Sequence, residues 1–178
     1  MSTEVKEREE DLDLMMIDDD EGDALSNKYM LFKIADEVYG IEIRFVTEII
    51  ELQKITEVPD LPDYIKGVIN LRGRVIPVMD VRLRFKMQPR EYDDRTCIII
   101  VRTHETSIGF VVDTVAEVQS ISESNMEEAP KFSNSTKKEQ YIKSLGKVDG
   151  DVKILLDVEK IIFQDELSVI EKNINQEN

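Results

Sequence analysis

Short apolar or alternating runs, separated by turn residues, follow one another from Tyr29 to Leu156. Each run is four to seven residues long and either alternates apolar with polar positions or is apolar throughout, as β-strands do. The ten strands that this pattern predicts are 29–34, 38–43, 47–52, 68–71, 75–79, 96–101, 108–112, 115–121, 142–148 and 152–156. Ten short strands at close spacing indicate a mainly β fold, built as small barrels or as a sandwich.

A tight hairpin is predicted where strands 68–71 and 75–79 flank the tripeptide Arg72-Gly73-Arg74. Gly73 can supply the positive φ angle that such a turn needs. Pro77 cannot donate a backbone hydrogen bond. Its strand is therefore expected at a sheet edge, or with a bulge at that position.

The pattern contains an internal repeat. Segment 39–49 matches segment 108–118 at an offset of 69 residues, and a block that starts at residue 64 matches one that starts at residue 141, at an offset of 77. The identical pairs are Gly40 and Gly109, Val46 and Val115, Glu48 and Glu117, Tyr64 and Tyr141, Ile65 and Ile142, Lys66 and Lys143, Gly73 and Gly150, Val75 and Val152, Asp80 and Asp157, and Val81 and Val158. Chance alternation of apolar residues does not readily produce these identities in one order, so the repeat indicates a duplication.

The duplication predicts two five-stranded subdomains, about 28–88 and 94–163, with 87–95 as the crossing between them. Each subdomain is too small to bury much surface alone, so the two are expected to pack on a shared core. Asp80 and Asp157 each follow a strand and precede a short apolar run. This position is typical of a helix N-cap, where a carboxylate accepts backbone N–H bonds.

The two ends of the chain differ from this body. Residues 1–27 hold 11 acids against 2 bases and are expected to form a disordered acidic tail. The tail either solubilises the chain only, or folds on a partner through its mixed acidic and apolar segment 11–23. At the other end, apolar residues recur at helical spacing, which predicts a C-terminal helix or tail over 164–178.

The charge of the chain argues against one class of function. The net charge is −15, and an acidic surface repels nucleic-acid phosphates and anionic lipid, so a nucleic-acid-binding small barrel is disfavoured. Residues 66–95 have a net positive charge instead, with eight bases against four acids. They form either an ordinary solvated face or a patch for an acidic partner. No apolar run is long enough to insert into a membrane, and the single cysteine allows no intrachain disulfide, so a cytoplasmic location is expected.

Side chains for catalysis or metal binding are scarce. His104 is the only histidine and lies in an expected turn between two strands, while Cys97 lies in an apolar strand. One histidine and one cysteine cannot build a metal cage. The chain also has no glycine-rich phosphate loop and no serine-centred nucleophile motif. The sequence therefore predicts a protein with no catalytic residues, no metal and no cofactor.

Segment 58–85, with its Asn70-Leu71-Arg72-Gly73 core, resembles the signature of the bacterial chemotaxis coupling proteins, the CheW-like domain family. Segments 39–43, 108–113 and 154–160 are similar to that family too, and the resemblance covers about residues 28–163. It implies two SH3-like five-stranded β-barrel subdomains on a shared core. It also implies a non-catalytic adaptor that joins chemoreceptors to the histidine kinase CheA and is located with the membrane-bound receptor arrays. An adaptor of a non-flagellar chemosensory pathway is the alternative within this class.

The resemblance implies that the cytoplasmic tip of a chemoreceptor binds in a groove between the subdomains. The residues implied for this receptor groove are Val46, Glu48, Arg72, Gly73, Ile98, Gly109, Val115 and Val118. Arg72 is expected to pair with Glu48 and hold the shape of the groove, or to form an ordinary surface ion pair. Val115 and Val118 are either groove residues or ordinary core residues.

The second implied partner is the regulatory domain of CheA, which would meet an exposed barrel end or edge. Pro130, Lys131 and Phe132 are implied for contact with the kinase or with neighbours in a ring. Phe132 is either an exposed aromatic anchor or a plug of the local core.

Overall fold

The computed structural model describes residues 25–104, 106–129 and 141–163. Its strands are β1 (Lys28–Ile34), β2 (Glu37–Glu42), β3 (Val46–Glu51), β4 (Ile65–Leu71), β5 (Arg74–Asp80), β6 (Cys97–Arg102), β7 (Ser107–Val112), β8 (Thr114–Ser120), β9 (Met126–Glu127), β10 (Ile142–Val148) and β11 (Asp151–Leu156). Its helical elements are the 3-10 helices η1 (Ile43–Phe45) and η2 (Glu123–Asn125) and the short helices α3 (Val81–Arg84) and α4 (Val158–Phe163). All ten expected strands are present. Strand β9 was not predicted, because a strand of two residues is too short to show alternation.

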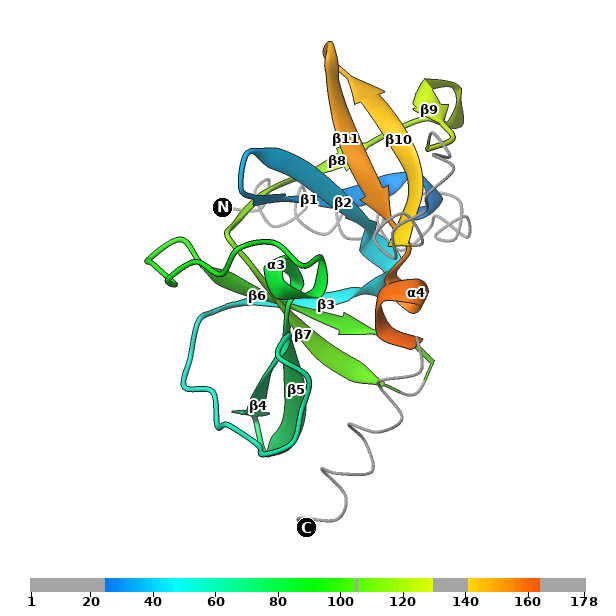
Figure 1. Ribbon diagram of the computed structural model, residues 1–178. Coiled ribbons are helices and arrows are strands. Elements are labelled where there is room, and N and C mark those ends of the chain that lie inside the picture. The colour runs from blue at the N-terminus through cyan, green and yellow to red at the C-terminus, as the bar shows by residue number, and fades with distance from the viewer. Residues whose placement is uncertain (1–24, 105, 130–140, 164–178) are drawn as a thin grey trace, which may run out of the picture.

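The strands form two sheets, which lie one above the other in the view of Figure 1. The six-stranded sheet has the order β8-β1-β2-β11-β10-β9, and the five-stranded sheet has the order β3-β6-β7-β5-β4. Neighbouring strands are antiparallel, except for the parallel pairs β2–β11 and β5–β7. The predicted mainly β fold class is therefore confirmed.

Each sheet is built from both copies of the repeat. The first two strands of each copy lie in one sheet with the later strands of the other copy, and, apart from the additional β9, the same order recurs in both sheets. The sheets therefore cut across the sequence halves 28–88 and 94–163, and neither half forms a sheet of its own. The physical reason is that β8 pairs with β1 and β3 pairs with β6, so each copy completes the sheet of the other. The repeated order supports the duplication.

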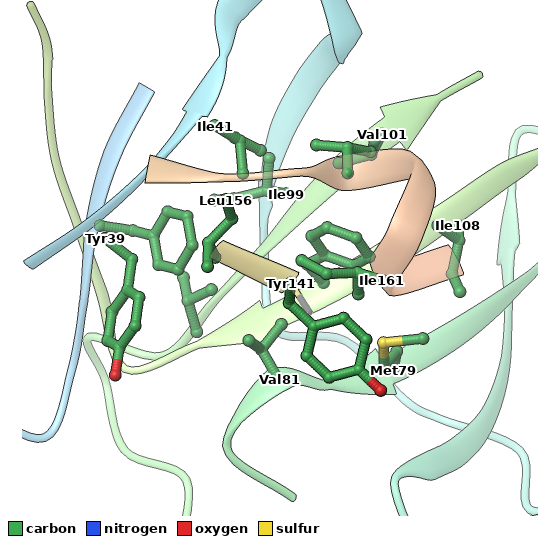
Figure 2. Close-up of a cluster of buried hydrophobic side chains, with 14 of the residues drawn as sticks. Tyr39, Ile41, Met79, Val81, Ile99, Val101, Ile108, Tyr141, Leu156 and Ile161 are labelled. Atoms are coloured by element: carbon green, nitrogen blue, oxygen red, sulfur yellow. The ribbon is translucent and has the colours of Figure 1, made fainter. Parts of the chain in front are cut away.

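The main hydrophobic core takes side chains from both sheets and from both short helices (Figure 2). Its aromatic rings form a chain in which the centroids of Phe32 and Tyr39 are 6.0 Å apart, those of Tyr39 and Phe85 5.7 Å, and those of Phe85 and Tyr141 5.8 Å. Offset rings at these distances add to the stabilisation that burial alone gives. The two copies of the repeat thus share one core.

One charged side chain, Arg84, is buried where the two copies meet. Its guanidinium carbon lies 4.5 Å from the ring centre of Tyr64 and 4.8 Å from that of Tyr141, and its Nη2 donates to the carbonyl of Ile161 at 3.1 Å. Burial lowers the pKa of Arg84. Tyr64 and Tyr141 are repeat equivalents, and so are Arg84 and Ile161. A cation between two aromatic faces therefore ties equivalent points of the two copies together.

The hairpins β4–β5 and β10–β11 end in the same two-residue turn. Arg72 and Gly73 have φ angles of 52° and 84°, and Asp149 and Gly150 have 52° and 81°. Two consecutive positive φ angles are the mark of a type I′ turn, which matches the twist of the flanking strands. The positive φ predicted for Gly73 is confirmed, and the turn includes Arg72 as well.

Pro77 corrects one expectation from the sequence. Strand β5 is an interior strand of its sheet, between β7 and β4, and its one register shift with β4 lies at Ile65 and Gly67 of β4. Pairing of β5 with β7 covers only Val78 to Asp80. Pro77 therefore precedes the stretch that is paired on both sides, and neither a sheet edge nor a bulge in β5 is needed to accommodate it.

Both predicted N-caps are present. Oδ1 of Asp80 accepts from the backbone N–H of Leu83 at 3.2 Å, and Oδ1 of Asp157 accepts from that of Lys160 at 3.1 Å. Asp80 also accepts a 2.7 Å hydrogen bond from the hydroxyl of Tyr92, and Asp157 has no such second contact among the described residues.

The two caps give a matched prediction on stability. Asp157→Ala is expected to lower the free energy of unfolding by about 1 kcal/mol, the usual cost of losing an N-cap. Asp80→Ala is expected to cost more, because it also leaves the half-buried hydroxyl of Tyr92 without its acceptor. Urea denaturation of both variants checks this order, and equal losses would contradict it.

Candidate functional site

Arg72 and Glu48 form a bidentate ion pair. Nη1 of Arg72 donates to Oε1 of Glu48 and Nη2 donates to Oε2, both at 2.9 Å. Glu48 lies on β3, an edge strand of the five-stranded sheet, and Arg72 lies in the turn of the β4–β5 hairpin at the other edge. The contact therefore joins the two edges of this sheet, and the pairing predicted from the sequence is confirmed.

The geometry of this pair depends on the turn. A planar guanidinium that meets a carboxylate through two parallel hydrogen bonds fixes direction as well as distance. The positive φ of Arg72 and the hydrogen bond from the N–H of Gly73 to Oδ1 of Asn70, at 2.8 Å, hold the turn that aims the side chain. The side chain of Arg72 is 73% exposed, so a partner protein can reach it.

The pairing changes the protonation of Glu48. The hydrogen bonds from Arg72 hold the pKa of the Glu48 carboxyl below its ordinary value, and the same contact raises the pKa of Arg72. A carboxyl with a depressed pKa in the folded state favours the paired form above its ordinary pKa and loses that preference as the pH falls through the depressed value.

This shift can be measured directly. In the wild-type chain, the side-chain carboxyl resonance of Glu48 is expected to titrate with a pKa below the ordinary glutamate value of about 4.3. In Arg72→Gln, the pKa is expected to return towards that value, because the cationic donor is gone. Carbon-13 NMR over the acid range measures both, and an unchanged pKa in the variant would contradict the pairing.

Strands β3 and β8 are equivalent edge strands. They are the same strand of the two repeat copies, and each lies at one end of its sheet. Val46 on β3 and Val115 on β8 are half-buried, and both pack against the main core. Val118 is 48% exposed and its repeat equivalent Ile49 is 40% exposed. The structure thus offers apolar side chains on both edge strands.

Ile49 is a residue that the sequence reasoning missed. Ile49 follows Glu48 and precedes Ile50, so alternation along this strand does not tell which of the two isoleucines is exposed. The repeat could have found it, since an offset of 69 residues places it on Val118, which the resemblance did imply.

Two residues implied for the groove lie beneath the surface instead. Ile98 has no exposed surface and belongs to a core cluster of the five-stranded sheet. Gly109 is buried beside it, and a Cβ at position 109 would lie 2.7 Å from Cγ2 of Ile98. These two residues therefore pack against each other in the interior of the five-stranded sheet, and neither is placed to touch a ligand.

The residues implied for kinase or ring contact lie outside the described part of the chain. Pro130, Lys131 and Phe132 all fall in segment 130–140. Their assignment stays a prediction from the sequence.

A polar cluster lies beneath the crossing segment 87–95. Asp113 accepts hydrogen bonds from the side chains of Arg82 and Arg90 and from the backbone N–H of Ala35. The hydroxyl of Tyr92 donates to Asp80, and burial together with this carboxylate raises the pKa of Tyr92. The carboxylates of Asp80 and Asp113 both accept hydrogen bonds within the cluster, which therefore anchors the crossing segment.

The side chains considered for catalysis or metal binding, Cys97 and His104, do not form a cluster. Cys97 is half-buried and its Sγ donates to the carbonyl of Arg95 at 3.2 Å, while the side chain of His104 is 89% exposed. Within residues 25–104, 106–129 and 141–163, no three His, Cys, Asp or Glu side chains are placed to hold a metal ion. A helix able to span a bilayer, which needs about 20 apolar residues, is also absent from these described stretches.

Comparison with known proteins places this architecture in one group. Residues 28–166 match the family model described as the CheW-like domain. The chain is 33% identical over 150 residues to a protein of Klebsiella aerogenes named chemotaxis protein CheW, covering 84% of this chain and 90% of the relative. A protein of the same name from Thermotoga maritima is 35% identical over 143 residues, with 79% and 91% covered. The crystal structure of the scaffolding protein TtCheW from Thermoanaerobacter tengcongensis superimposes with a TM-score of 0.71 at 32% identity, covering 79% of this chain and 94% of that one.

Proposed function

The chain belongs to the CheW-like domain family, and from this premise we propose that it is a non-catalytic adaptor that couples chemoreceptors to the histidine kinase CheA in bacterial chemotaxis signalling. The observation that carries the proposal is the family match over residues 28–166, which spans both sheets. An adaptor needs two binding surfaces and no reactive groups. The proposed location is the cytoplasmic face of membrane-bound receptor arrays.

The receptor surface is assigned to the region between the two edge strands. Val46, Val115 and Val118 supply apolar contacts, and the ion pair of Arg72 with Glu48 supplies a fixed, exposed cation. A helix that docks in a groove uses apolar anchors on one face and polar contacts at the rim. The helical cytoplasmic tip of a chemoreceptor has this form, so we assign it to this surface. Gly73 keeps the turn of Arg72 in its conformation.

Contact with the kinase, or with neighbours in a ring, is assigned to a different stretch of the sequence. Pro130, Lys131 and Phe132 carry this assignment from the family resemblance, with Phe132 as the aromatic anchor. Two separate surfaces would allow receptor and kinase to be held at the same time, as an adaptor requires.

Calorimetry with purified partners tests this proposal. The full chain is titrated with a soluble receptor cytoplasmic fragment, then with the regulatory domain of CheA, and finally with one partner in the presence of the other. The expected result is that each partner binds and neither displaces the other. Failure to bind either partner would overturn the adaptor assignment, and mutual displacement would overturn the assignment of separate surfaces.

A further inference from the structure

The acidic N-terminal segment joins the fold at the start of β1, beside both edge strands. The backbone N–H of Ile121, directly after β8, donates to the carbonyl of Asn27 at 2.8 Å. On the other side of β1, Tyr29 pairs with Glu42, the last residue of β2. Helix η1 and then β3 follow Glu42 along the chain. Residues 1–24 therefore attach where β8 ends and where the connection from β2 to β3 begins (Figure 1).

Exposed apolar side chains lie near this junction. Leu25 is 38% exposed and lies at the junction itself, and Val118, 48% exposed, is paired with Met30 on β1. Ile49, 40% exposed, follows Glu42 by one 3-10 turn and part of β3, a path of at most about 20 Å. Among the described residues, these are three of the five exposed large apolar side chains. The junction thus lies within a short reach of the apolar residues of both edge strands.

Basic side chains lie at the same junction. Lys28 is exposed at the start of β1. Arg44 and Lys143 both pair with the carboxylate of Glu42, at 3.2 Å and 3.0 Å, and their side chains are 58% and 39% exposed. Because these three bases share one carboxylate, positive charge remains at the junction for an acidic partner. Arg72, 73% exposed, adds a further cation beside β3.

The sequence that precedes the junction has the complementary composition. Segment 12–17 holds five apolar residues and one acid, and it is flanked by the acids of 9–11 on one side and those of 18–23 on the other. Ile17 is ten positions before Asn27, and ten extended residues span at most about 35 Å. The apolar segment can therefore reach Val118 and Ile49, while its flanking acids can reach the bases of the junction.

From these features we propose that segment 12–17 docks on the exposed apolar side chains of β3 and β8 of its own chain and competes there with the receptor tip. The inference rests on the proposed function, because this surface is the one assigned to the receptor. The occupant is the chain's own segment because it is attached at the edge of the surface. A short tether gives an effective concentration in the millimolar range, so a weak contact is sufficient.

Methyl NMR of the full chain without any receptor tests the docking. The wild type is compared with the triple variant Leu14→Ser, Met16→Ser and Ile17→Ser, which keeps the length and the charge of the chain. Val5→Ser is the matched control, an apolar residue outside the segment. The triple variant is expected to shift the methyl resonances on β3 and β8, and the control is expected to leave them as in the wild type.

The resonances to follow are those of Ile49 and Val118, with Val75 and Val152 as internal controls. These two valines are 52% and 50% exposed at the hairpin tips and are expected not to respond. Higher salt is expected to move the wild-type resonances towards those of the triple variant, because it screens the acids from the bases. Unchanged Ile49 and Val118 resonances in the triple variant would overturn the docking. A difference that disappears on dilution would assign the segment to a second copy and overturn docking within one chain.

Titration with a soluble receptor fragment tests the competition. If the segment covers the surface in about 80% of the molecules, the triple variant binds the fragment about fivefold more tightly than the wild type, because only uncovered molecules are competent. Val5→Ser is expected to bind as the wild type does. Unchanged affinity in the triple variant would overturn the competition. If methyl resonances respond but no variant binds the fragment, the receptor assignment fails and the docking stands, whereas receptor binding with unresponsive resonances overturns the docking alone.

Discussion

Arg72→Glu is expected to lower the affinity of the chain for a receptor tip by about tenfold or more. In the wild type, the guanidinium of Arg72 meets Glu48 through two 2.9 Å hydrogen bonds and joins the two edges of the five-stranded sheet. The substitution puts two carboxylates opposite each other, so the turn moves away from β3 and the exposed cation is lost. Because the pair lies at the surface, the fold is expected to survive, with an unchanged circular dichroism spectrum.

Two further variants make this prediction specific. The exchange Arg72→Glu with Glu48→Arg restores opposite charges and is expected to recover part of the affinity, because the junction between edges reforms. Arg74→Glu changes the same net charge two residues away and is expected to leave the affinity unchanged. Fluorescence anisotropy with a labelled receptor fragment measures all three. Equal affinities for Arg72→Glu and the wild type would remove Arg72 from the receptor surface.

Gly67→Ala is expected to destabilise the fold by at least about 3 kcal/mol. Gly67 has a φ angle of 142°, and a Cβ at this position would lie 2.0 Å from the backbone oxygen of Thr56. That oxygen accepts the N–H of Val68 at 2.9 Å, so the neighbouring segment cannot withdraw without losing a backbone hydrogen bond. The clash is with backbone, which has no other rotamer to adopt.

Gly73→Ala is the matched control for Gly67→Ala. Gly73 also has a positive φ, at 84°, but a Cβ there meets nothing within 4 Å. Its cost is therefore only the strain of a side chain in the left-handed region, about 1–2 kcal/mol. Urea denaturation of both variants gives the comparison. Similar losses of unfolding free energy would show that close packing at Gly67 has been overestimated.

Local features of this chain are readable from its sequence. The ten strands follow from alternation and turn residues, and the two N-caps follow from a carboxylate placed between a strand and a short apolar run. The pairing of Arg72 with Glu48 was also accessible, because a turn residue and an edge-strand residue of opposite charge were both implied for one groove. Each of these depends on a few neighbouring residues.

Strand exchange between the repeat copies could not be predicted in the same way. Alternation tells which strands exist, but it carries no signal for whether β3 pairs with a strand of its own copy or with β6. Both arrangements bury the same apolar positions. The contact of Arg84 with Tyr64 and Tyr141 could not be predicted for a related reason. A charged residue in a basic stretch is expected to be exposed, and its burial depends on one tyrosine from each repeat copy.

The repeat adds a second residue to one of the candidate positions. Val118 was implied by resemblance, and its equivalent Ile49 completes the pair of exposed apolar residues on the two edge strands. Ile98 and Gly109 were implied as groove residues, yet both are buried and pack against each other. The sequence identifies these residues only as a group. The packing of the structure is needed to distinguish exposed residues, which can contact a ligand, from buried ones, which support the surface.

Kinase activity in a reconstituted receptor array tests the coupling function most directly. Receptor-containing membranes and CheA are assayed for phosphorylation with and without the full chain, and then with receptor ligand added. The account predicts that the chain raises kinase activity, that receptor ligand then changes this activity, and that Arg72→Glu fails to support the response. Activity that is independent of the chain, with or without receptor ligand, would contradict the assignment of this protein as a receptor–kinase adaptor.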